Sequence, residues 1–254
     1  KFIRGSSLLL AGALPAAGLS AAGLSPTDTA DSVGILPANA PTARREIKVG
    51  LVGCGSRGLT VVNSLLAAGR PDCYVQLTAV ADAFPDSVQR LLRGLKGKYP
   101  QQVTVDSASR CLGLDGYRKL LEGDVDLVLL ATPPAFRPQH FEAAVAAGKH
   151  IYAEKPIAID VSGVARFQAA NQRALEQHLV VGVGLPRRFH PQYQATVAQL
   201  RSGAIGEIVS AQAIQTLRQS KTNLGGRSRS SDLEVQLRNW TQHAWASGGP
   251  WVEP

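Results

Sequence analysis

The feature that most constrains the fold is a regular alternation, from Ile47 onward, between short apolar runs and longer amphipathic stretches. This alternation is typical of βαβ units, in which a helix connects each strand of a parallel sheet to the next. The predicted strands span residues 47–52, 74–81, 102–105, 126–131, 150–153 and 179–183. The predicted helices span residues 57–68, 85–95, 116–121, 138–147 and 161–177. The fold class is therefore α/β, with a doubly wound parallel sheet over residues 46–184.

The pattern changes after Gly184. A helix that ends near Ser202 and a strand over residues 207–217 are expected there, and residues 185–254 are assigned to the start of an incomplete α+β substrate domain. A strand by itself would leave an unpaired edge, which natural domains usually cover. Residues 218–254 show no clear period, and no element is predicted for them.

A glycine motif follows the first predicted strand, where the chain reads Gly53-x-Gly55-x-x-Gly58 and then enters a predicted helix. In a Rossmann-type domain the first glycine permits a tight turn, the second lets the backbone approach a pyrophosphate, and the third lets helix and strand pack closely. N–H groups at the start of the helix, around Ser56 and Arg57, bind the phosphates. The spacing alone is a weak signal in a chain with 25 glycines, and its position between strand and helix gives it weight.

Asp82 stands at the end of the second predicted strand, where a carboxylate can accept hydrogen bonds from an adenosine ribose. The motif and this acid together predict a dinucleotide site over residues 46–184. Asp82 would repel a 2′-phosphate, so NAD is favoured and NADP stays open. Arg57 has two interpretations, as a guanidinium that stabilises the phosphates of either cofactor and as a solvated arginine at a helix start.

Four stretches together carry a resemblance to a known family. They are VGLVGCGSRG, VDLVLLATPP, AAVAAGKHIYAEKPIAID and LRSGAIGEIVSAQA, and they occur in the family's order and spacing over residues 47–213. This combination resembles the Gfo/Idh/MocA oxidoreductases, and the Glu154-Lys155-Pro156 triplet is its most specific element. The resemblance implies NAD(P)-dependent hydride transfer to or from a sugar, sugar acid or cyclitol, with Lys155 as the active-site lysine.

The residues of the triplet support the same interpretation. Lys155 follows a predicted parallel strand, and the carboxyl ends of such strands face the crevice where cofactor and substrate meet. An ammonium there can hold a substrate hydroxyl and stabilise charge on its oxygen. Pro156 restricts the conformation of Lys155, and a cis bond would aim it further. Glu154 is expected to balance or position Lys155, and both are expected among the cofactor-binding residues. The alternative for the triplet is a surface turn whose ion pair contributes little.

The resemblance also places Thr132 and Pro133 beside the nicotinamide ribose. Many members have a histidine early in the next helix, where this chain has Arg137, and His140 comes one turn later. His140 is therefore expected to be a satisfied, partly buried histidine rather than a ligand.

The stretch GLPRRFHP after the sixth predicted strand offers Arg187, Arg188 and His190 as candidate substrate-binding residues at the domain junction. Such side chains bind sugar hydroxyls or acidic groups. A solvated linker explains them equally well.

The N-terminal stretch has the layout of an export signal. Residues 1–24 combine the basic Lys1 and Arg4 with a Leu/Ala/Gly-rich run, interrupted by Pro15, that is poorly suited to a membrane span. The first four residues resemble those that come after the paired arginines of a twin-arginine signal, and the pair itself is not in this chain. Export to the periplasm or another extracytoplasmic space is expected, with residues 25–45 as a linker or arm; a frayed N-terminal helix is the alternative.

The catalytic base is not assigned. Family members carry a His, often with an Asp, on a helix that this chain is expected to lack, and the surroundings of His243 do not match that helix. The chain by itself is therefore expected to bind cofactor and to have little dehydrogenase activity. Two other functions stay open, an NAD-using glycosidase of the same superfamily and a non-catalytic dinucleotide-binding module.

Other partners are limited by composition. The net charge of +8 comes from scattered basic residues without an aromatic-basic motif, so nucleic-acid binding is not expected. Cys54, Cys73 and Cys111 lack metal-ligand spacing, so no metal site is expected and the thiols are interpreted as small buried side chains. A small carbohydrate is the expected substrate, and a homo-oligomer stays open.

Overall fold

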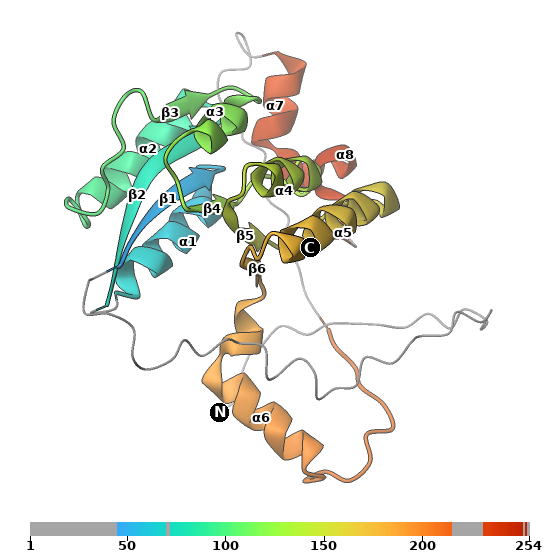
Figure 1. Cartoon of the computed structure of the whole chain (residues 1–254). Coiled ribbons are helices and arrows are strands. Elements are labelled where there is room, and N and C mark those ends of the chain that lie inside the picture. The colour runs from blue at the N-terminus through green and yellow to red at the C-terminus, as the bar shows by residue number, and fades with distance from the viewer. Residues whose placement is uncertain (1–44, 70–71, 215–230, 251, 253–254) are drawn as a thin grey trace.

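The computed structural model describes residues 45–69, 72–214, 231–250 and 252 (Figure 1). The predicted export segment and arm, residues 1–24 and 25–45, lie outside the described residues except for Arg45.

Six parallel strands form the sheet, in the order β3-β2-β1-β4-β5-β6. They are β1 (Arg45–Val52), β2 (Cys73–Asp82), β3 (Arg110–Leu112), β4 (Leu127–Leu130), β5 (His150–Glu154) and β6 (Val181–Gly184). This is the strand order of a Rossmann fold, and the order reverses between β1 and β4. The predicted α/β class is confirmed. Ligands of such sheets bind outside the carboxyl ends of the strands at that reversal.

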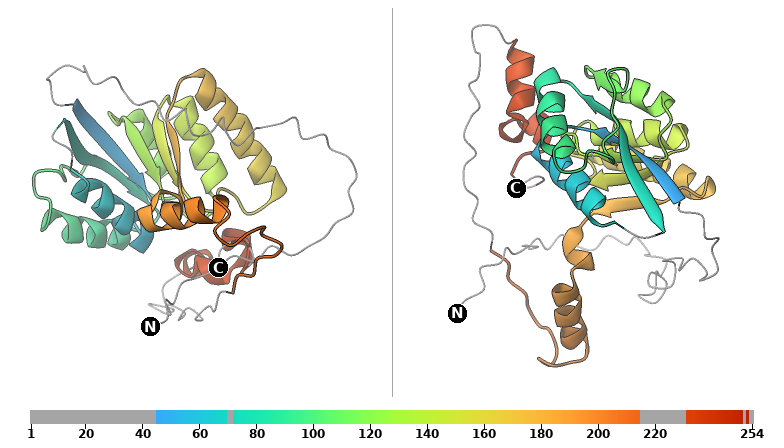
Figure 2. Two further views of the ribbon diagram at one scale, coloured as in Figure 1. Left: turned by 90° about the horizontal axis from the view of Figure 1, so that it is seen from below. Right: turned by 90° about the vertical axis from the view of Figure 1, so that its left-hand side faces the viewer.

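Helices cover both faces of the sheet (Figures 1 and 2). The first five are α1 (Ser56–Ala67), α2 (Pro85–Lys96), α3 (Gly116–Glu122), α4 (Arg137–Ala146) and α5 (Val161–Glu176), which agree with the predicted bounds to within one residue at each end. Helices α1 and α2 pack on one face, and α3, α4 and α5 pack on the other. Along β4, Val128 and Leu130 therefore join one core while Leu129 joins the other. Both faces are buried, which explains why the strands read as continuous apolar runs.

Helix α2 illustrates how the local sequence specifies an element. Pro85 opens it, where a missing N–H costs nothing, and Asp86 lies in the first turn while Arg93 and Lys96 lie in the last. Its buried residues recur at helical spacing and are Val88, Leu91, Leu92 and Leu95. Charge and apolar pattern thus agree on the same helix.

The predicted third strand was wrong. Residues 102–105 make only one bridge, between Leu77 and Val103, and the strand that pairs with β2 is Arg110–Leu112, in register with Val80–Asp82. Val103 and Val105 are buried by packing rather than by a ladder. The actual β3 has a single buried residue, Cys111, so it carries no apolar run that a sequence could reveal.

The strand predicted over residues 207–217 was also wrong for the part that the structure describes. Residues 207–214 have no regular secondary structure, and all but Ala213 are exposed. The rest of that range, residues 215–217, lies outside the described residues. The β-branched pattern there has no neighbouring strand among the described residues to complete a ladder.

Two segments follow β6 and behave differently. The first contains η1 (Pro186–Phe189) and the predicted helix, α6 (Pro191–Arg201), and neither buries a residue. The second contains α7 (Asp232–Arg238), η2 (Trp240–Gln242) and α8 (Ala244–Ser247), which no periodicity predicted. We call residues 231–250 the C-terminal segment. It packs against the Rossmann domain, where Arg238 of α7 pairs with Asp86 of α2, and α7 lies beside α2 in the right view of Figure 2.

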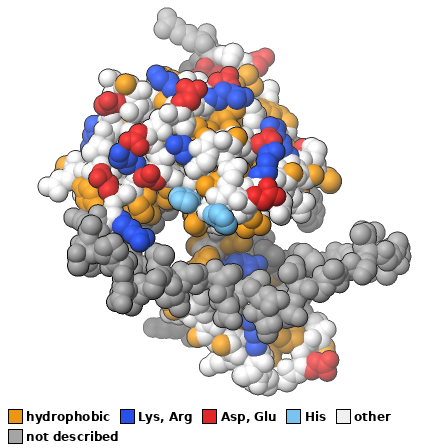
Figure 3. Space-filling view, in the orientation of Figure 1, with side chains coloured by type: hydrophobic (Ala, Val, Ile, Leu, Met, Phe, Trp, Pro, Cys, Tyr) orange, Lys and Arg blue, Asp and Glu red, His pale blue; other side chains and the backbone are white. Residues whose placement is uncertain are grey.

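Surface charge is mixed on the face seen in Figure 3, where basic and acidic side chains are interspersed over the Rossmann domain. Within the described ranges, every helix is too short or too polar to cross a bilayer.

Candidate functional site

The glycine loop lies at the carboxyl end of β1, beside the reversal of strand order. Gly53 has a φ of +99°, and a Cβ there would lie 2.7 Å from the main chain of Ala131, so only glycine fits this turn. A Cβ on Gly58 would lie 2.1 Å from the Gly53 oxygen, which shows how closely α1 and β1 pack. Gly55 has no heavy atom within 4 Å of its Cβ position and is exposed. The loop thus keeps an open backbone surface of the kind that a pyrophosphate needs.

The start of α1 completes this surface. Gly55 is the N-cap without a side-chain cap, and the first turn holds no acidic residue. Its N–H groups therefore face the cleft without a competing carboxylate from the helix itself, which suits an anion. Ser56 and Arg57, predicted to bind the cofactor, are exposed at this point.

Asp82 lies across the loop at the end of β2. Its carboxylate accepts hydrogen bonds from the Cys54 N–H at 2.7 Å and the Phe84 N–H at 2.9 Å. Burial raises the pKa of Asp82, and the two backbone hydrogen bonds oppose that shift. The carboxylate is thus oriented by the main chain and only partly covered, as the predicted ribose contact requires.

A small hollow of about 80 Å³ lies between the ends of β1, β2 and β4. Its lining includes Asp82, Tyr117, Thr132, Phe136 and His140. Two of the predicted cofactor residues, Asp82 and Thr132, therefore face the same cleft although they come from different strands. Pro133 follows Thr132, and its carbonyl accepts the Phe136 N–H at 3.1 Å.

The Glu154-Lys155-Pro156 triplet lies at the end of β5, on the same edge of the sheet. The Lys155–Pro156 bond is cis, in agreement with the sequence-based hypothesis, and Lys155 is exposed. Glu154 is only 2% exposed and forms an ion pair with Arg57 at 2.8 Å. A Cβ on Gly184 of β6 would lie 2.6 Å from this carboxylate, so the glycine leaves room for it.

The ion pair changes two sequence interpretations. Glu154 was expected to balance or position Lys155, which stays a prediction, and the structure in addition joins it to Arg57 and thereby ties the β5 end to the glycine loop. Arg57 is half-exposed and binds a protein carboxylate. It therefore fits neither the interpretation as a solvated arginine nor the one as a guanidinium that contacts only cofactor phosphates. Both residues were singled out from motifs, but nothing in their separate positions indicated that they meet.

Arg137 has a role that sequence reasoning missed. It is 3% exposed and donates to the main-chain oxygens of Thr132 and Pro156. It therefore connects the loop after β4 to the loop that carries Lys155. A buried arginine is unusual, and its multiple donors in a rigid fork suit two carbonyls on separate loops. Its place beside Pro138, at the start of a helix, was the only signal.

His140 is satisfied, as expected from the sequence, and it is more fully buried than expected. Its Nδ1 lies 3.0 Å from Thr132 Oγ1, and its ring packs at 4.3 Å from that of Tyr117. Burial, with the nearby Arg137, lowers the pKa of His140 to about 4. The ring is therefore neutral near pH 7 and helps to hold the Thr132 side chain in place.

Arg187, Arg188 and His190 remain predictions for substrate binding. All three are exposed on the segment that follows β6, and β6 pairs with β5 up to Glu154 and Gly184. The segment that carries them therefore begins at the same edge of the sheet as Lys155, at the end of the neighbouring strand. The His190 ring contacts that of Tyr193 at 5.6 Å.

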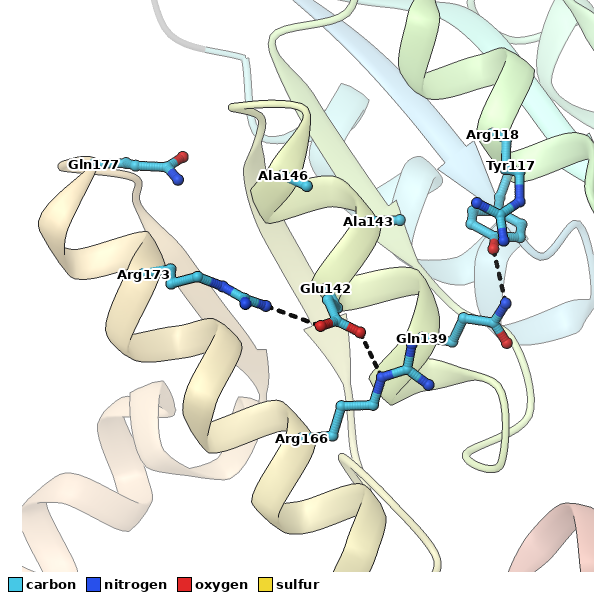
Figure 4. A pocket seen from close by; sticks show the side chains of 9 residues that line it. All are labelled: Tyr117, Arg118, Gln139, Glu142, Ala143, Ala146, Arg166, Arg173 and Gln177. Carbon is cyan, nitrogen blue, oxygen red and sulfur yellow. Dashed lines mark hydrogen bonds and ion pairs between the residues drawn. The ribbon is translucent and has the colours of Figure 1, made fainter.

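A larger hollow, about 490 Å³, lies elsewhere, between the outer sides of α3, α4 and α5. Figure 4 shows Glu142 between Arg166 and Arg173, with ion-pair distances of 2.5 and 2.9 Å. Arg118, also in its lining, pairs with Asp115. Each of these arginines forms an ion pair with a carboxylate, and the pairs with Glu142 connect α5 to α4. We therefore attribute the hollow to helix packing rather than to ligand binding.

Among the described residues, neither the thiols nor the potential metal ligands form an alternative site. Cys54 and Cys111 are buried and Cys73 is partly buried, all three as free thiols. Burial raises the pKa of Cys54, which makes its thiol inert. In the part of the chain that the structure describes, His, Cys, Asp and Glu form no cluster that could hold a metal ion.

Comparison with known proteins agrees with this geometry. The Gfo/Idh/MocA model, described as an oxidoreductase family with an NAD-binding Rossmann fold, matches residues 47–185. Inositol 2-dehydrogenase from Rhizobium meliloti is 30% identical over 64% of this chain and 43% of its own length. The dTDP-3,4-didehydro-2,6-dideoxy-alpha-D-glucose 3-reductase from Actinomadura kijaniata is 30% identical over 71% of this chain and 48% of its own length.

Solved structures show the same fold. KijD10, a 3-ketoreductase from Actinomadura kijaniata in complex with NADP, matches with a TM-score of 0.50 and 28% identity over 64% of this chain and 46% of that one. The scyllo-inositol dehydrogenase from Lactobacillus casei with bound NAD(H) and scyllo-inositol has a TM-score of 0.51 and 24% identity over 64% and 43%. The chain therefore spans less than half the length of each of these proteins.

Proposed function

This chain belongs to the Gfo/Idh/MocA family of oxidoreductases, and on that premise we propose that the whole protein transfers a hydride between NAD or NADP and a sugar, sugar acid or cyclitol. The relatives named above are dehydrogenases and reductases of such molecules, which favours an oxidoreductase over the glycosidase and the non-catalytic module. The observation that carries the proposal is the position of Lys155. Lys155 is an exposed residue that directly follows the carboxyl end of β5, on the same edge of the sheet as the open glycine loop.

The residues present fit a nicotinamide dinucleotide. Gly55 leaves the backbone open where a pyrophosphate would lie, α1 presents uncapped N–H groups, and Asp82 offers a main-chain-oriented carboxylate to the ribose. Thr132 and Pro133 would border the nicotinamide half from the loop after β4. The bound nucleotide would supply the hydride acceptor or donor.

Lys155 has two tasks in this proposal. Its ammonium binds the oxygen of the reacting carbinol or carbonyl and holds the carbon in place for transfer. It also stabilises the partial negative charge that develops on that oxygen. Placement of the lysine comes from contacts around it, because Glu154 is held by Arg57 and Pro156 by Arg137. Substrate hydroxyls would reach Arg187, Arg188 and His190 from the segment after β6.

The first test identifies the nucleotide. The chain is purified under mild conditions and denatured, and the released nucleotide is identified by mass spectrometry; stripped protein is then titrated with NADH and with NADPH. Binding of NADH in the micromolar range is expected. A failure to bind either nucleotide at millimolar concentration would reject the proposal.

The second test concerns Lys155. In the whole protein, Lys155→Ala is expected to keep NADH affinity within about twofold and to abolish NADH formation with a panel of inositols and sugars, because its ammonium acts on the substrate oxygen. Lys149→Ala, which removes a half-buried lysine just before the opposite end of β5, is the matched control. Equal turnover in both variants would contradict the role of Lys155.

We also propose that the protein is exported. The support is the basic start and Leu/Ala/Gly-rich run of residues 1–24, with residues 25–45 as a linker. A reporter that is active only outside the cytoplasm, fused after residue 46, would be expected to gain activity in a bacterial host. A reporter that stays inactive both with this segment and with paired arginines added in front of it would exclude export by this route.

A further inference from the structure

The C-terminal segment reaches the ribose end of the cleft. The Ala135 N–H donates to the Ala246 oxygen at 3.2 Å, and the rings of Phe136 and Trp245 meet edge to face at 6.1 Å. These contacts attach the segment to the loop after β4. At its other end, α7 attaches to the residues that come after β2, and the two loops flank the hollow that contains Asp82.

Arg238 makes the contact on the β2 side. Its guanidinium donates to both carboxylate oxygens of Asp86, at 3.0 and 3.2 Å, and its Nε donates to Glu234 at 2.9 Å. It also lies over the Phe84 ring, 3.9 Å from its centroid. Its side chain is 24% exposed, so this charge is partly screened from water.

Phe84 connects Arg238 to Asp82, the carboxylate proposed to bind the ribose. The Phe84 N–H is one of the two donors that hold Asp82, while the Phe84 ring carries Arg238. Asp86 lies in the first turn of α2, only one turn further on. The negative charge of Asp86 raises the pKa of Asp82, and Arg238 balances that charge by a partly buried bidentate contact, beside the exposed contact from Arg90.

We propose that Arg238 is a specificity-determining residue of the cofactor site: by neutralising Asp86 it admits the 2′-phosphate of NADP beside Asp82. This inference rests on the proposed function, because it assumes that Asp82 binds the adenosine ribose. It would allow a chain whose β2 ends in an acid to bind NADP as well as NAD. The charge comes from a segment remote in sequence, so the β2 end alone does not determine cofactor preference.

The experiment compares two variants that break the same ion pair. Arg238→Gln removes the positive charge and Asp86→Asn removes the negative one, so any loosening of the C-terminal segment is common to both. Dissociation constants for NADH and NADPH are measured by nicotinamide fluorescence. The ratio Kd(NADPH)/Kd(NADH) is expected to rise about fivefold in Arg238→Gln and to fall about fivefold in Asp86→Asn.

Arg90→Gln is the matched control. Arg90 binds the same Asp86 carboxylate at 2.8 Å, but it is 68% exposed and lies on α2 itself. Its ratio should stay within about twofold of the wild type. A ratio that shifts in the same direction in both main variants, or in neither, would overturn the inference and leave Arg238 as a structural contact.

Two results with the wild-type protein separate the inference from its premise. Protein that binds NADH but not NADPH would overturn the role of Arg238 while leaving the proposed function intact. Protein that binds neither nucleotide would overturn the proposed function and the inference with it.

Discussion

The two ends of the proposed cofactor cleft differ in how their side chains are held. At the end that carries Lys155, the supporting groups are buried and belong to the Rossmann domain itself, with Glu154 at 2% and Arg137 at 3% exposure. At the ribose end, Asp82 is held by main-chain N–H groups, and the charge next to it is set by Arg238 of the C-terminal segment.

This difference separates stability from selectivity. A buried charge that loses its partner costs several kcal/mol. Substitutions at the Lys155 end should therefore lower the free energy of unfolding of the whole domain. Ion pairs that remain partly exposed contribute little to stability, so changes at the ribose end should alter mainly nucleotide preference. Substitutions at both ends would test this contrast, and the largest effect is expected at Arg137.

Arg137→Leu should lower the free energy of unfolding by about 3 kcal/mol, because the oxygens of Thr132 and Pro156 lose a charged donor. Urea unfolding monitored by circular dichroism measures it. Arg90→Leu, on the exposed side of α2, should change stability by less than about 0.5 kcal/mol. A loss below about 1 kcal/mol in Arg137→Leu would mean that the two loops are held by other contacts.

His140 should make the stability of the fold sensitive to acid. Its folded pKa of about 4 lies below the unfolded value of 6.5, so the unfolded chain binds the extra proton between these pH values. The neutral His140 therefore contributes to the free energy of unfolding above pH 6.5. This contribution, about 3 kcal/mol in total, is lost as the pH falls toward 4. His140→Gln should lack this part of the pH dependence in urea unfolding; identical pH profiles would argue against it.

Arg57→Gln should destabilise the fold by about 1–2 kcal/mol, because it removes the cation that faces the buried Glu154. Glu154→Gln should cost less, since the half-exposed Arg57 returns to water. Thermal unfolding of both variants and the double variant gives the coupling between them. Arg118→Gln is the control, because both side chains of the Arg118–Asp115 pair are exposed, and it should hardly change the free energy of unfolding. A coupling near zero would show that the pair does not join the two loops.

Trp245→Ala should have the smallest effect on stability, about 0.5–1 kcal/mol, because its ring contact with Phe136 lies at the ribose end. Hydrogen exchange of the Ala135 amide, which donates to Ala246, should nevertheless become faster as the C-terminal segment loosens. Tyr193→Ala on α6 has similar exposure and should leave this amide unchanged. An unchanged rate in Trp245→Ala would show that the tryptophan does not hold the segment.

Much of the fold could be predicted because its signals are local. Helices α1 to α5 each carry their own apolar period, and the glycine turn needs a left-handed residue at Gly53 whatever surrounds it. Strand β3 escaped prediction because three residues at a sheet edge, with one buried, contain no period. Helix α7 had one unused signal, the Ser231-x-x-Glu234 pattern, and the Ser231 side chain does cap the Glu234 N–H.

The sequence by itself determined the doubly wound sheet, the open glycine loop, Asp82 at the end of β2 and Lys155 at the end of β5, because each depends on neighbours within a few residues. Only the tertiary structure decided that Glu154 pairs with Arg57, that Arg137 joins two loops, and that Arg238 lies beside Asp86. These contacts join residues remote along the chain. Their partners are chosen by which strand ends and loops the packed sheet brings together, and a charged side chain has no sequence period that would reveal the choice.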